Sequence, residues 1–427
     1  MKSHIVRVRP GFTGAVFCLA VCLLCGAVAL SRAAAGNPAA QTDPTSPSVS
    51  ASSSASPATS GETGEPVSIA VSEEMRGVWV PYMALSVQGE EAFRDRVDEI
   101  IETSKQAGMN ALFVQVRPFG DALYPSDLYP FSHILTGTQG KDPGYDPMAI
   151  FIEKAHGAGM AFYAWVNPLR VKTASTPETL ADSNPAVQWQ SKSETKRYVI
   201  TWDDAMYLNP AYEDVRTYIA DGVAEIAARY EVDGIEFDDY FYPTQEAGFD
   251  KTEYEAYREE AEKSGTALSL LEWRTANINA LISLCYQKIK AADPTVTFGI
   301  SPQGNLSNDT AMGADVATWC SVPGYIDTLC PQLYVNDQNT VLPFSETAET
   351  WAELTEDSHV TLYLGLAAYK AGTDADDGTW LQETGILRQQ VETGRSLSCD
   401  GFCFYSWEQL VSPACSDELS ELLTVFS

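Results

Sequence analysis

Acidic side chains crowd into one short segment of the chain, DGIEFDDYFYP, which runs from Asp233 to Pro243. Glu236, Asp238 and Asp239 place three carboxyl groups within four residues. Neighbouring carboxylates repel one another, and this crowding separates their pKa values, so that one group holds a proton while another stays charged. Cleavage of a glycosidic bond needs such a pair of an acid and an anion. The alternative is a structural role, in which these acids pair with basic groups such as Arg117 or Arg170.

The elements that position this segment follow a repeated pattern, in which short apolar runs alternate with longer helical stretches. Eight runs have the length and composition of strands: 77–80, 111–116, 161–166, 234–237, 297–301, 328–334, 362–367 and 401–405. Eight strands with helices between most of them predict an α/β fold, a (β/α)8 TIM barrel with extended βα loops.

Alternation within the strands predicts which side chains face the barrel lumen, because successive residues of a strand point to opposite faces. In 234–237 the aliphatic Ile235 and Phe237 would meet the helices, which leaves Glu236 and Asp238 in the lumen. The same reasoning directs polar residues of three other strands inward near their carboxyl ends. A TIM-barrel enzyme keeps its catalytic residues at that end. We therefore expect Asp238 to be the key carboxylate, with Asp239 and Glu236 as acid or supporting groups.

Further residues are candidates for substrate binding at the same end of the barrel. Amides, a guanidinium and a phenol could hydrogen-bond to sugar hydroxyls: Gln115, Arg117, Asn167, Asn209, Gln303, Gln332 and Tyr334. Aromatic rings could stack on apolar sugar faces: Trp165, Tyr240, Tyr242 and Tyr369. Two excursions longer than ordinary loops, 172–206 and 243–266, should build the walls of a cleft.

A second acid on another strand could complete the catalytic pair. Asp121, Asp337 and Glu408 each follow a strand end, and the sequence does not choose among them. The separation of the two carboxyl groups, which decides between retention and inversion of configuration, cannot be read from the sequence either.

Motifs along the chain resemble those of the glycosyl-hydrolase-like family ten barrels, in the expected order from Arg76 to Trp407. They are RGVW at 76–79, NALFVQVRP at 110–118, GYDP at 144–147, WVNP at 165–168, LNP at 208–210, GISP at 299–302 and PQLY at 331–334, together with DGIEFDDYFYP. The resemblance implies an enzyme of the bacterial envelope, or a secreted one, that acts on glycans. Peptidoglycan strands are a known type of substrate for members of this family.

The chain departs from its relatives at two positions of the pocket. Glu236 stands where many relatives have His, and Gln303 stands where many have Phe, so fine specificity does not carry over. The strand also resembles the D-G-x-x-x-D strand of alpha-amylase-like enzymes, whose last Asp is the nucleophile. In family eighteen chitinases the same strand ends in a catalytic Glu, and Tyr240 occupies that position here.

The N-terminal segment predicts export from the cytoplasm. Residues 1–35 combine a basic start, an apolar centre and small residues at the exit, which describes a signal peptide or an uncleaved membrane anchor. Residues 36–70 are rich in Ser, Ala, Pro and Thr and should form a disordered linker. Residues 71–427 then form the barrel domain, in an extracytoplasmic location, secreted or anchored to the cell envelope.

Composition excludes several classes of function. The formal net charge of −31, with 58 acidic against 27 basic residues, makes nucleic acid and anionic lipid surfaces poor partners. The four histidines form no H-x-H or H-E-x-x-H pattern, so we expect neither a metal nor another cofactor. The six cysteines after residue 280 are interpreted as buried thiols, with one or two disulfides as the alternative.

These observations together predict an exported glycosidase that cleaves the O-glycosidic bonds of a polysaccharide, for example the glycan strands of peptidoglycan. The enzyme would use carboxylate acid–base chemistry and no cofactor. A glycan-binding barrel of the cell envelope that has lost turnover is the main alternative. A barrel lyase or deacetylase is disfavoured by the lack of metal-binding histidines.

Overall fold

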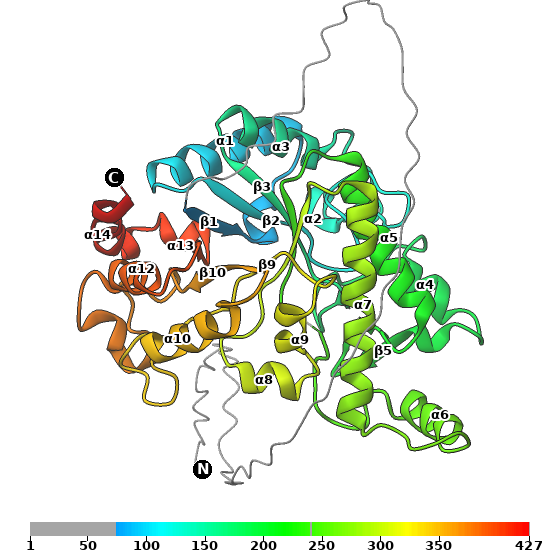
Figure 1. Ribbon diagram of the computed structural model, residues 1–427. Helices are drawn as coiled ribbons and strands as arrows, with labels where there is room; N and C mark the ends of the chain where they lie inside the picture. The colour runs from blue at the N-terminus through cyan, green and yellow to red at the C-terminus, as the bar shows by residue number, and fades with distance from the viewer. Residues whose placement is uncertain (1–73, 240, 427) are drawn as a thin grey trace, which may run out of the picture. The chain divides into compact units, whose positions relative to one another are not determined.

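Eight parallel strands close into a barrel in the computed structural model, which describes residues 74–239 and 241–426 (Figure 1). The strands are β1 Met75–Val80, β2 Ala111–Arg117, β3 Ala161–Val166, β7 Gly234–Phe237, β8 Thr297–Ile300, β9 Thr328–Leu329, β10 Thr361–Leu366 and β11 Gly401–Phe404. They follow one another around the barrel in chain order, and β11 closes the ring by pairing with β1. This confirms the predicted TIM-barrel fold, although the strand expected at 328–334 spans only two residues.

Helices surround the barrel between successive strands, as Figure 1 shows. The principal helices are α1 Glu90–Gln106, α3 Pro147–Gly157, α5 Glu213–Arg229, α7 Leu270–Ala292, α9 Val316–Ser321, α10 Phe344–Thr355, α12 Ile386–Ser396 and α14 Ser416–Phe426. Shorter helices lie in the connections: α2 His133–Thr136, α4 Pro185–Gln190, α6 Lys251–Ala261, α8 Leu306–Ala311, α11 Ala375–Gly378 and α13 Trp407–Leu410. Four 3-10 turns complete the set: η1 Tyr82–Leu85, η2 Lys196–Tyr198, η3 Thr379–Leu381 and η4 Pro413–Cys415.

Local sequence signals account for where two of these helices begin and which face they bury. Asp146 caps α3 by accepting a hydrogen bond from the Ala149 amide at 3.0 Å, and Pro147 occupies the first helical turn. In α5 the apolar stripe is fully buried, because it packs against the barrel and α7; its members are Val215, Ile219, Val223 and Ile226.

The core has two parts, separated by the sheet itself. Leu112, Val114 and Ile235 belong to the large layer between barrel and helices. A smaller, aromatic-rich cluster that includes Trp79, Phe113, Tyr163 and Trp165 fills the lumen. Phe113 and Tyr163 stack there with ring centroids 4.5 Å apart. Ile235 therefore lies on the helix-facing side of the sheet, as the alternation within its strand predicted.

Gly234 is required by this packing. A Cβ added at this position would lie 2.5 Å from a ring carbon of Tyr163 and 2.4 Å from the hydroxyl of Thr297. Only a residue without a side chain lets the strand that carries the acidic segment pass beside the aromatic lumen.

A bulge near the end of β2 changes the direction of Arg117. Gln115 pairs with Trp165, whereas Arg117 pairs with Val166, so the register slips between them. Arg117 therefore leaves the lumen and lies 4.2 Å above the ring of Tyr129, where it is 1 % exposed. Its guanidinium comes so close to Gly222 of α5 that a Cβ there would be 2.4 Å from it. The expectation that Arg117 faces the lumen is wrong.

The two long excursions contain structure that the sequence pattern did not reveal. In the first, β4 Arg170–Lys172, β5 Val199–Trp202 and β6 Ala205–Leu208 form a three-stranded antiparallel sheet. The second contains α6, which projects beside the N-terminal end of α7 in Figure 1. Arg197 of the first excursion donates two hydrogen bonds of 2.7 Å to the carboxylate of Glu253 in the second, and these bonds link the two excursions.

The signal or anchor segment predicted for 1–35 and the linker predicted for 36–70 lie outside the described residues. Within residues 74–239 and 241–426, no helix combines the length and apolar character needed to cross a bilayer. Cys285, Cys320, Cys330, Cys399, Cys403 and Cys415 are free thiols, and all but Cys399 are buried.

Candidate active site

A pocket of about 230 Å³ opens at the carboxyl ends of the barrel strands. Its walls are two carboxylates, two small polar groups and five aromatic rings: Trp79, Trp165, Asp238, Asp239, Ser301, Gln332, Tyr334, Tyr369 and Tyr405. Pockets that enclose drug-sized ligands measure about 300–1,000 Å³, so this one suits a single small unit such as one sugar ring.

Asp238 lies at the centre of a hydrogen-bonded chain that starts on β2. Gln115 donates to Oδ1 of Asn167 at 2.6 Å, and its own side-chain oxygen accepts the Tyr82 amide at 3.0 Å. Asn167 in turn donates to Oδ2 of Asp238, the same oxygen that accepts the indole N–H of Trp165 at 3.0 Å. Two donors on one carboxylate oxygen favour the ionised form. Asp238 is 3 % exposed, so these two hydrogen bonds hold its carboxyl group in one orientation inside the pocket wall.

Asp239, which also lines the pocket, has a different environment. Its Oδ1 accepts one hydrogen bond of 3.1 Å from Gln332, whose amide also donates to the Ser301 carbonyl. Burial raises the pKa of the Asp239 carboxyl above its ordinary value, and the Gln332 hydrogen bond and the charge of Arg170 offset only part of that rise. Asp239 is the carboxyl group of the pocket that is suited to hold a proton.

Glu236 faces the lumen, as the alternation of β7 predicted, but it does not line the pocket. Its carboxyl group packs against Gly299 and Thr328 of the neighbouring strands, and its Oε1 has no hydrogen-bond partner among the described residues. Burial, followed by the nearby Cys330 and Asp238, holds the pKa of Glu236 well above its usual range. Glu236 lies deeper in the lumen than the residues that line the pocket, which corrects its expected place at the barrel mouth.

Aromatic rings form the side of the pocket that faces the two carboxylates. Tyr334 lies edge-on to Tyr369 with ring centroids 5.7 Å apart, and Tyr405 lies 5.7 Å from Tyr334 and 6.4 Å from Trp165. Tyr369 keeps 38 % of its surface exposed. Such rings present flat apolar faces with polar edges, which suits contact with a sugar.

Three other candidate binding residues lie elsewhere. Arg117 is enclosed by α5 and Tyr129, as described above. Asn209 is fully buried and uses its side chain on the backbone, since it donates to the Arg197 carbonyl and accepts the Ala211 amide. Tyr242 is 2 % exposed and packs under Arg274, 4.9 Å from the guanidinium. None of these three lines the pocket.

The remaining candidate binding residues lie in the pocket or next to it. Gln115 and Asn167 act through Asp238, and Trp165, Gln332 and Tyr334 line the pocket itself. Gln303 lines an adjoining hollow. Tyr240 lies outside the described residues.

The suggested second acids do not enter the pocket. Asp337 accepts the amide and hydroxyl of Ser345, at 2.7 and 2.9 Å, and Glu408 is exposed on α13. Asp121 is completely buried and accepts a 2.9 Å hydrogen bond from Gln139.

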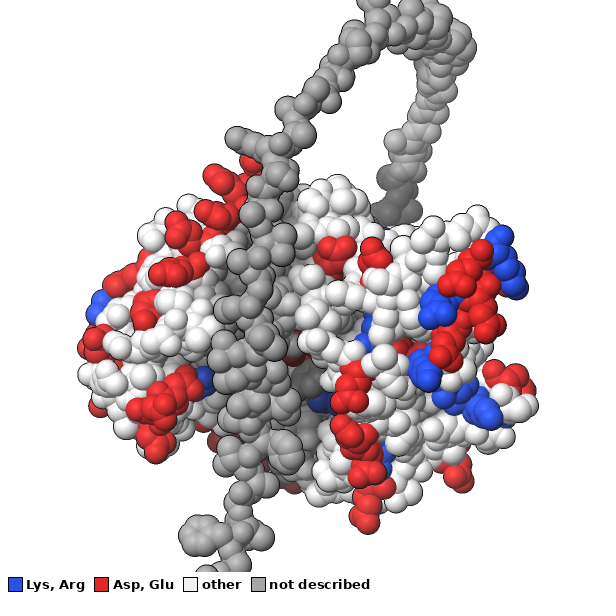
Figure 2. All heavy atoms as spheres, turned by 90° about the horizontal axis from the view of Figure 1, so that it is seen from below, with Lys and Arg blue, Asp and Glu red and all other residues white. Residues whose placement is uncertain are grey.

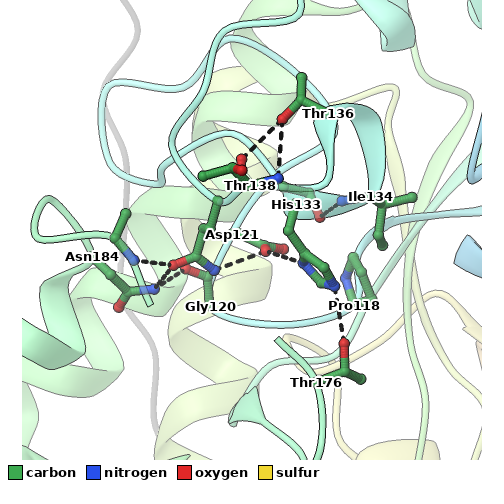
Figure 3. Close-up of polar contacts among 12 residues, drawn as sticks. Pro118, Gly120, Asp121, His133, Ile134, Thr136, Thr138, Thr176 and Asn184 are labelled. Carbon is green, nitrogen blue, oxygen red and sulfur yellow. Dashed lines mark hydrogen bonds and ion pairs between the residues drawn. The ribbon is translucent and has the colours of Figure 1, made fainter. Parts of the chain in front are cut away.

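The network around Asp121 anchors the first excursion. His133 lies 3.4 Å from Asp121 and 3.0 Å from the Thr176 hydroxyl, and Asn184 donates to the Gly120 carbonyl at 2.9 Å (Figure 3). Thr176 and Asn184 belong to the excursion, whereas Gly120 and Asp121 follow β2. Asp121 therefore reaches the excursion through His133, which contacts Thr176, and through Gln139, which accepts the Ala181 amide.

Sequence reasoning missed Trp79, Ser301 and Tyr405 as pocket residues. Tyr405 follows Cys403 at a spacing of two after β11, and Trp79 follows Gly77 in β1, so alternation within these strands would have placed both in the lumen. Across the described residues, no group of three or more His, Cys, Asp or Glu side chains is arranged to hold a metal ion.

Known proteins resemble this chain in sequence over most of its length. The family model described as "Glycosyl hydrolase-like 10" matches residues 74–382. Glycosyl hydrolase DigH of Escherichia coli O6:H1 is 30% identical over 390 residues, which cover 82% of this chain and 87% of that protein. Glycosyl hydrolase YngK of Bacillus subtilis is 33% identical over 345 residues, covering 74% of this chain and 64% of its own length.

A solved structure shares the fold at lower identity. The cold-adapted beta-galactosidase of Rahnella sp. R3 superposes with a TM-score of 0.54 at 11% identity, covering 84% of this chain and 56% of that one. The likeness concerns the barrel alone. With the family model covering the barrel from β1 to η3 and relatives matching most of the chain, this protein belongs to glycosyl hydrolase-like family 10.

Proposed function

We propose that this protein is a glycosidase that hydrolyses O-glycosidic bonds of a polysaccharide, with Asp238 and Asp239 as its reacting carboxyl groups. The observation that carries the proposal is their unequal environment within one pocket. Two donors on one oxygen of Asp238 favour its charged form, whereas burial favours the proton on Asp239. This is the division of roles that glycosidic cleavage uses.

The reaction would use the two groups at different atoms of the substrate. The neutral Asp239 donates its proton to the glycosidic oxygen as the bond to the anomeric carbon breaks. The anionic Asp238 stabilises the positive charge that develops on the sugar ring. Water then adds its oxygen to the anomeric carbon, and the proton that water releases restores Asp239. Trp79, Trp165 and the three tyrosines would hold the ring against the carboxylates.

The N-terminal sequence supports a location outside the cytoplasm, and family membership supports a glycan as the first substrate to test. A basic and then apolar start, followed by a Ser- and Pro-rich stretch, favours work outside the cytoplasm, secreted or held at the envelope. Glycan strands of peptidoglycan that have lost their peptides are then the first candidate substrate.

The test is incubation of the purified protein with chitin oligosaccharides, cello-oligosaccharides and peptide-free peptidoglycan strands, followed by mass spectrometry of the products. A glycosidase yields shorter chains whose summed mass exceeds that of the parent chain by one water for each cut. A lyase would yield fragments without added water. A barrel that only binds glycan would leave the parent chains uncut. Fragments without added water, or no fragments at all, would contradict the proposal.

A further inference from the structure

Arg117 is a buried cation with no carboxylate beside it. The fold encloses its side chain almost completely, and no Asp or Glu of the described residues forms an ion pair with it. The Tyr129 ring covers one face of the guanidinium at 4.2 Å, but the N–H groups lie in the guanidinium plane and still need acceptors. Nη1 has no hydrogen-bond partner in the described part of the chain. A buried charge of this kind strongly destabilises a fold unless an opposite charge neutralises it.

Arg274 shows how the same fold treats the second buried arginine among the described residues. The Asp250 carboxylate accepts hydrogen bonds from Nε and Nη2 of Arg274, at 2.9 and 2.6 Å. Backbone carbonyls of Thr244 and Glu246 accept two more, at 3.1 and 2.9 Å. Arg274 and Asp250 therefore form a neutral, fully bonded pair inside the protein. The contrast indicates that Arg117 needs an anion that its surrounding side chains do not provide.

Two further donors lie around the Arg117 guanidinium. The hydroxyl groups of Tyr124 and Tyr129 are buried, and neither has a hydrogen-bond partner among the described residues. At Gly222 of α5 an added Cβ would lie 2.4 Å from Nη1 of Arg117 and 2.9 Å from the Tyr129 hydroxyl, so these two groups approach α5 at one point. Tyr124 is close enough for the charge of Arg117 to act on its hydroxyl.

The two tyrosines do not supply the negative charge themselves. Burial raises the pKa of Tyr124 and of Tyr129, and the nearby charge of Arg117 offsets that rise only in part. Both phenols therefore stay neutral near pH 7 and keep their hydroxyl hydrogens. A guanidinium with two neutral hydroxyls beside it is a set of donors suited to an anion.

Glu225 of α5 is close enough for its charge to act on both tyrosines, but its oxygens are already used. One oxygen accepts the Ser126 hydroxyl, and the other accepts the Asp127 amide at 2.7 Å. The half-exposed Arg229 forms an ion pair with the same carboxylate at 3.2 Å. Glu225 thus has a cation of its own, and Arg117 is left without one of opposite sign.

The outer surface gives anions little reason to bind. The formal net charge is −31, acidic side chains are spread over the face seen in Figure 2, and the basic ones gather mainly at one side of that face. A surface of this sign repels anions. An effect of one particular anion on stability would therefore indicate a site in the interior.

We propose that Arg117, Tyr124 and Tyr129 bind one small monovalent anion, a halide such as chloride, between the end of β2 and α5. A halide accepts hydrogen bonds from several directions and neutralises the guanidinium, whereas a water molecule accepts fewer bonds and carries no charge. The burial of all three side chains favours a monatomic ion over larger oxyanions. The site shares no residue with the pocket, so it stands independently of the proposed glycosidase activity.

Thermal unfolding of the whole protein tests the site. The melting temperature is measured in sodium chloride and in sodium gluconate at equal ionic strength, and the difference is called the chloride effect. A ligand that binds only the folded state stabilises it, so the chloride effect of the parent should exceed that of Arg117→Met by about 2–5 °C. Bromide should replace chloride. Equal chloride effects in the two proteins would overturn the site.

A matched pair of variants keeps the test valid if Arg117→Met does not fold. Tyr124→Phe and Tyr242→Phe each remove a buried hydroxyl that has no partner among the described residues. Tyr242 packs on Arg274, whose charge Asp250 already neutralises. Tyr124→Phe should therefore lose most of the chloride effect, and Tyr242→Phe should retain it. The same chloride effect in both variants would contradict the proposal.

Anomalous diffraction from crystals of the parent protein in sodium bromide locates the ion. A bromide peak should lie within hydrogen-bonding reach of Nη1 of Arg117 and of the two tyrosine hydroxyls. A water molecule at that place, with no anomalous signal, would overturn the proposal. A bromide peak there without any chloride effect on melting would show an adventitious ion only, and would overturn it as well.

Discussion

The indole N–H of Trp165 points at Oδ2 of Asp238 over 3.0 Å, from the strand next to the one that carries the carboxylate. Asn167, two residues further along the chain, donates to the same oxygen. The orientation of Asp238 thus depends on Trp165, which packs in the lumen cluster, and on Asn167, which a hydrogen bond from Gln115 holds in place.

Replacing Trp165 by Phe keeps an aromatic ring in the lumen and removes this donor. A hydrogen bond to a charged group contributes about 1.5–3 kcal/mol, so kcat should fall by about 10- to 100-fold. Steady-state kinetics on the substrate that the panel identifies measures the loss. An unchanged kcat in a folded Trp165→Phe protein would show that the indole N–H does not orient Asp238 for the reaction.

Gln332 controls the proton on Asp239. Activity requires the protonated form, so it is lost as pH rises through the pKa of Asp239, which burial already raises. The Gln332 hydrogen bond lowers that pKa, and Gln332→Met should therefore move the alkaline limb of the profile of kcat/KM to higher pH. Gln303→Met, at the partner position of the same β-bridge, serves as the control and should leave the limb in place. A shift to lower pH would contradict the role of Asp239 as the acid.

Asp309 makes stability depend on pH. Burial raises its pKa from 3.8 to about 8, and its Oδ2 has no hydrogen-bond partner among the described residues. Between these two values the folded protein binds a proton that the unfolded chain has released, so the free energy of unfolding falls as pH rises. Asp309→Asn keeps an acceptor for the Gln303 amide and carries no such proton.

Relative to the parent, Asp309→Asn should therefore gain stability from pH 4 towards pH 8, by up to about 1.4 kcal/mol per pH unit. Urea unfolding at several pH values measures the difference. Parallel curves for parent and variant would show that Asp309 does not titrate on unfolding.

Substitution of Arg117 distinguishes a substrate-binding role of its side chain from a structural role. Its guanidinium lies against Tyr129 and α5, away from the pocket, so Arg117→Met should change kcat/KM by less than about threefold in the folded protein. Loss of the contact with the Tyr129 ring should instead appear as a change in melting temperature. A rise in KM with unaltered melting would restore the substrate-binding role expected from strand alternation.

Arg117 also shows where sequence reasoning reaches its limit. Alternation placed Asp238, Trp165 and Gln332 correctly, because the aliphatic faces of their strands must meet the helices. The bulge between Gln115 and Arg117 breaks that alternation, and nothing in the local sequence marks it. The residue types also do not reveal burial. Asn209 and Tyr242 were expected to bind substrate, but Asn209 bonds to the backbone of the insertion and Tyr242 packs against Arg274 of α7.

Depth along the barrel axis is the second property that the sequence does not carry. Glu236 and Asp238 share a face of β7, but one lies beneath the pocket and the other lines it. The excursions posed a similar problem, since their polar composition concealed the sheet of β4, β5 and β6 and the ion pair between Arg197 and Glu253.

The central claim is that Asp238 reacts with a sugar bound in the barrel mouth, and Asp238→Asn tests it most directly. The variant retains the shape of the side chain and loses the anion, so hydrolysis should fall by at least about a thousandfold. Binding of the same glycan by calorimetry should stay within a few-fold of the parent, and the melting temperature should change little. An Asp238→Asn protein that hydrolyses its substrate at the parent rate would contradict the claim.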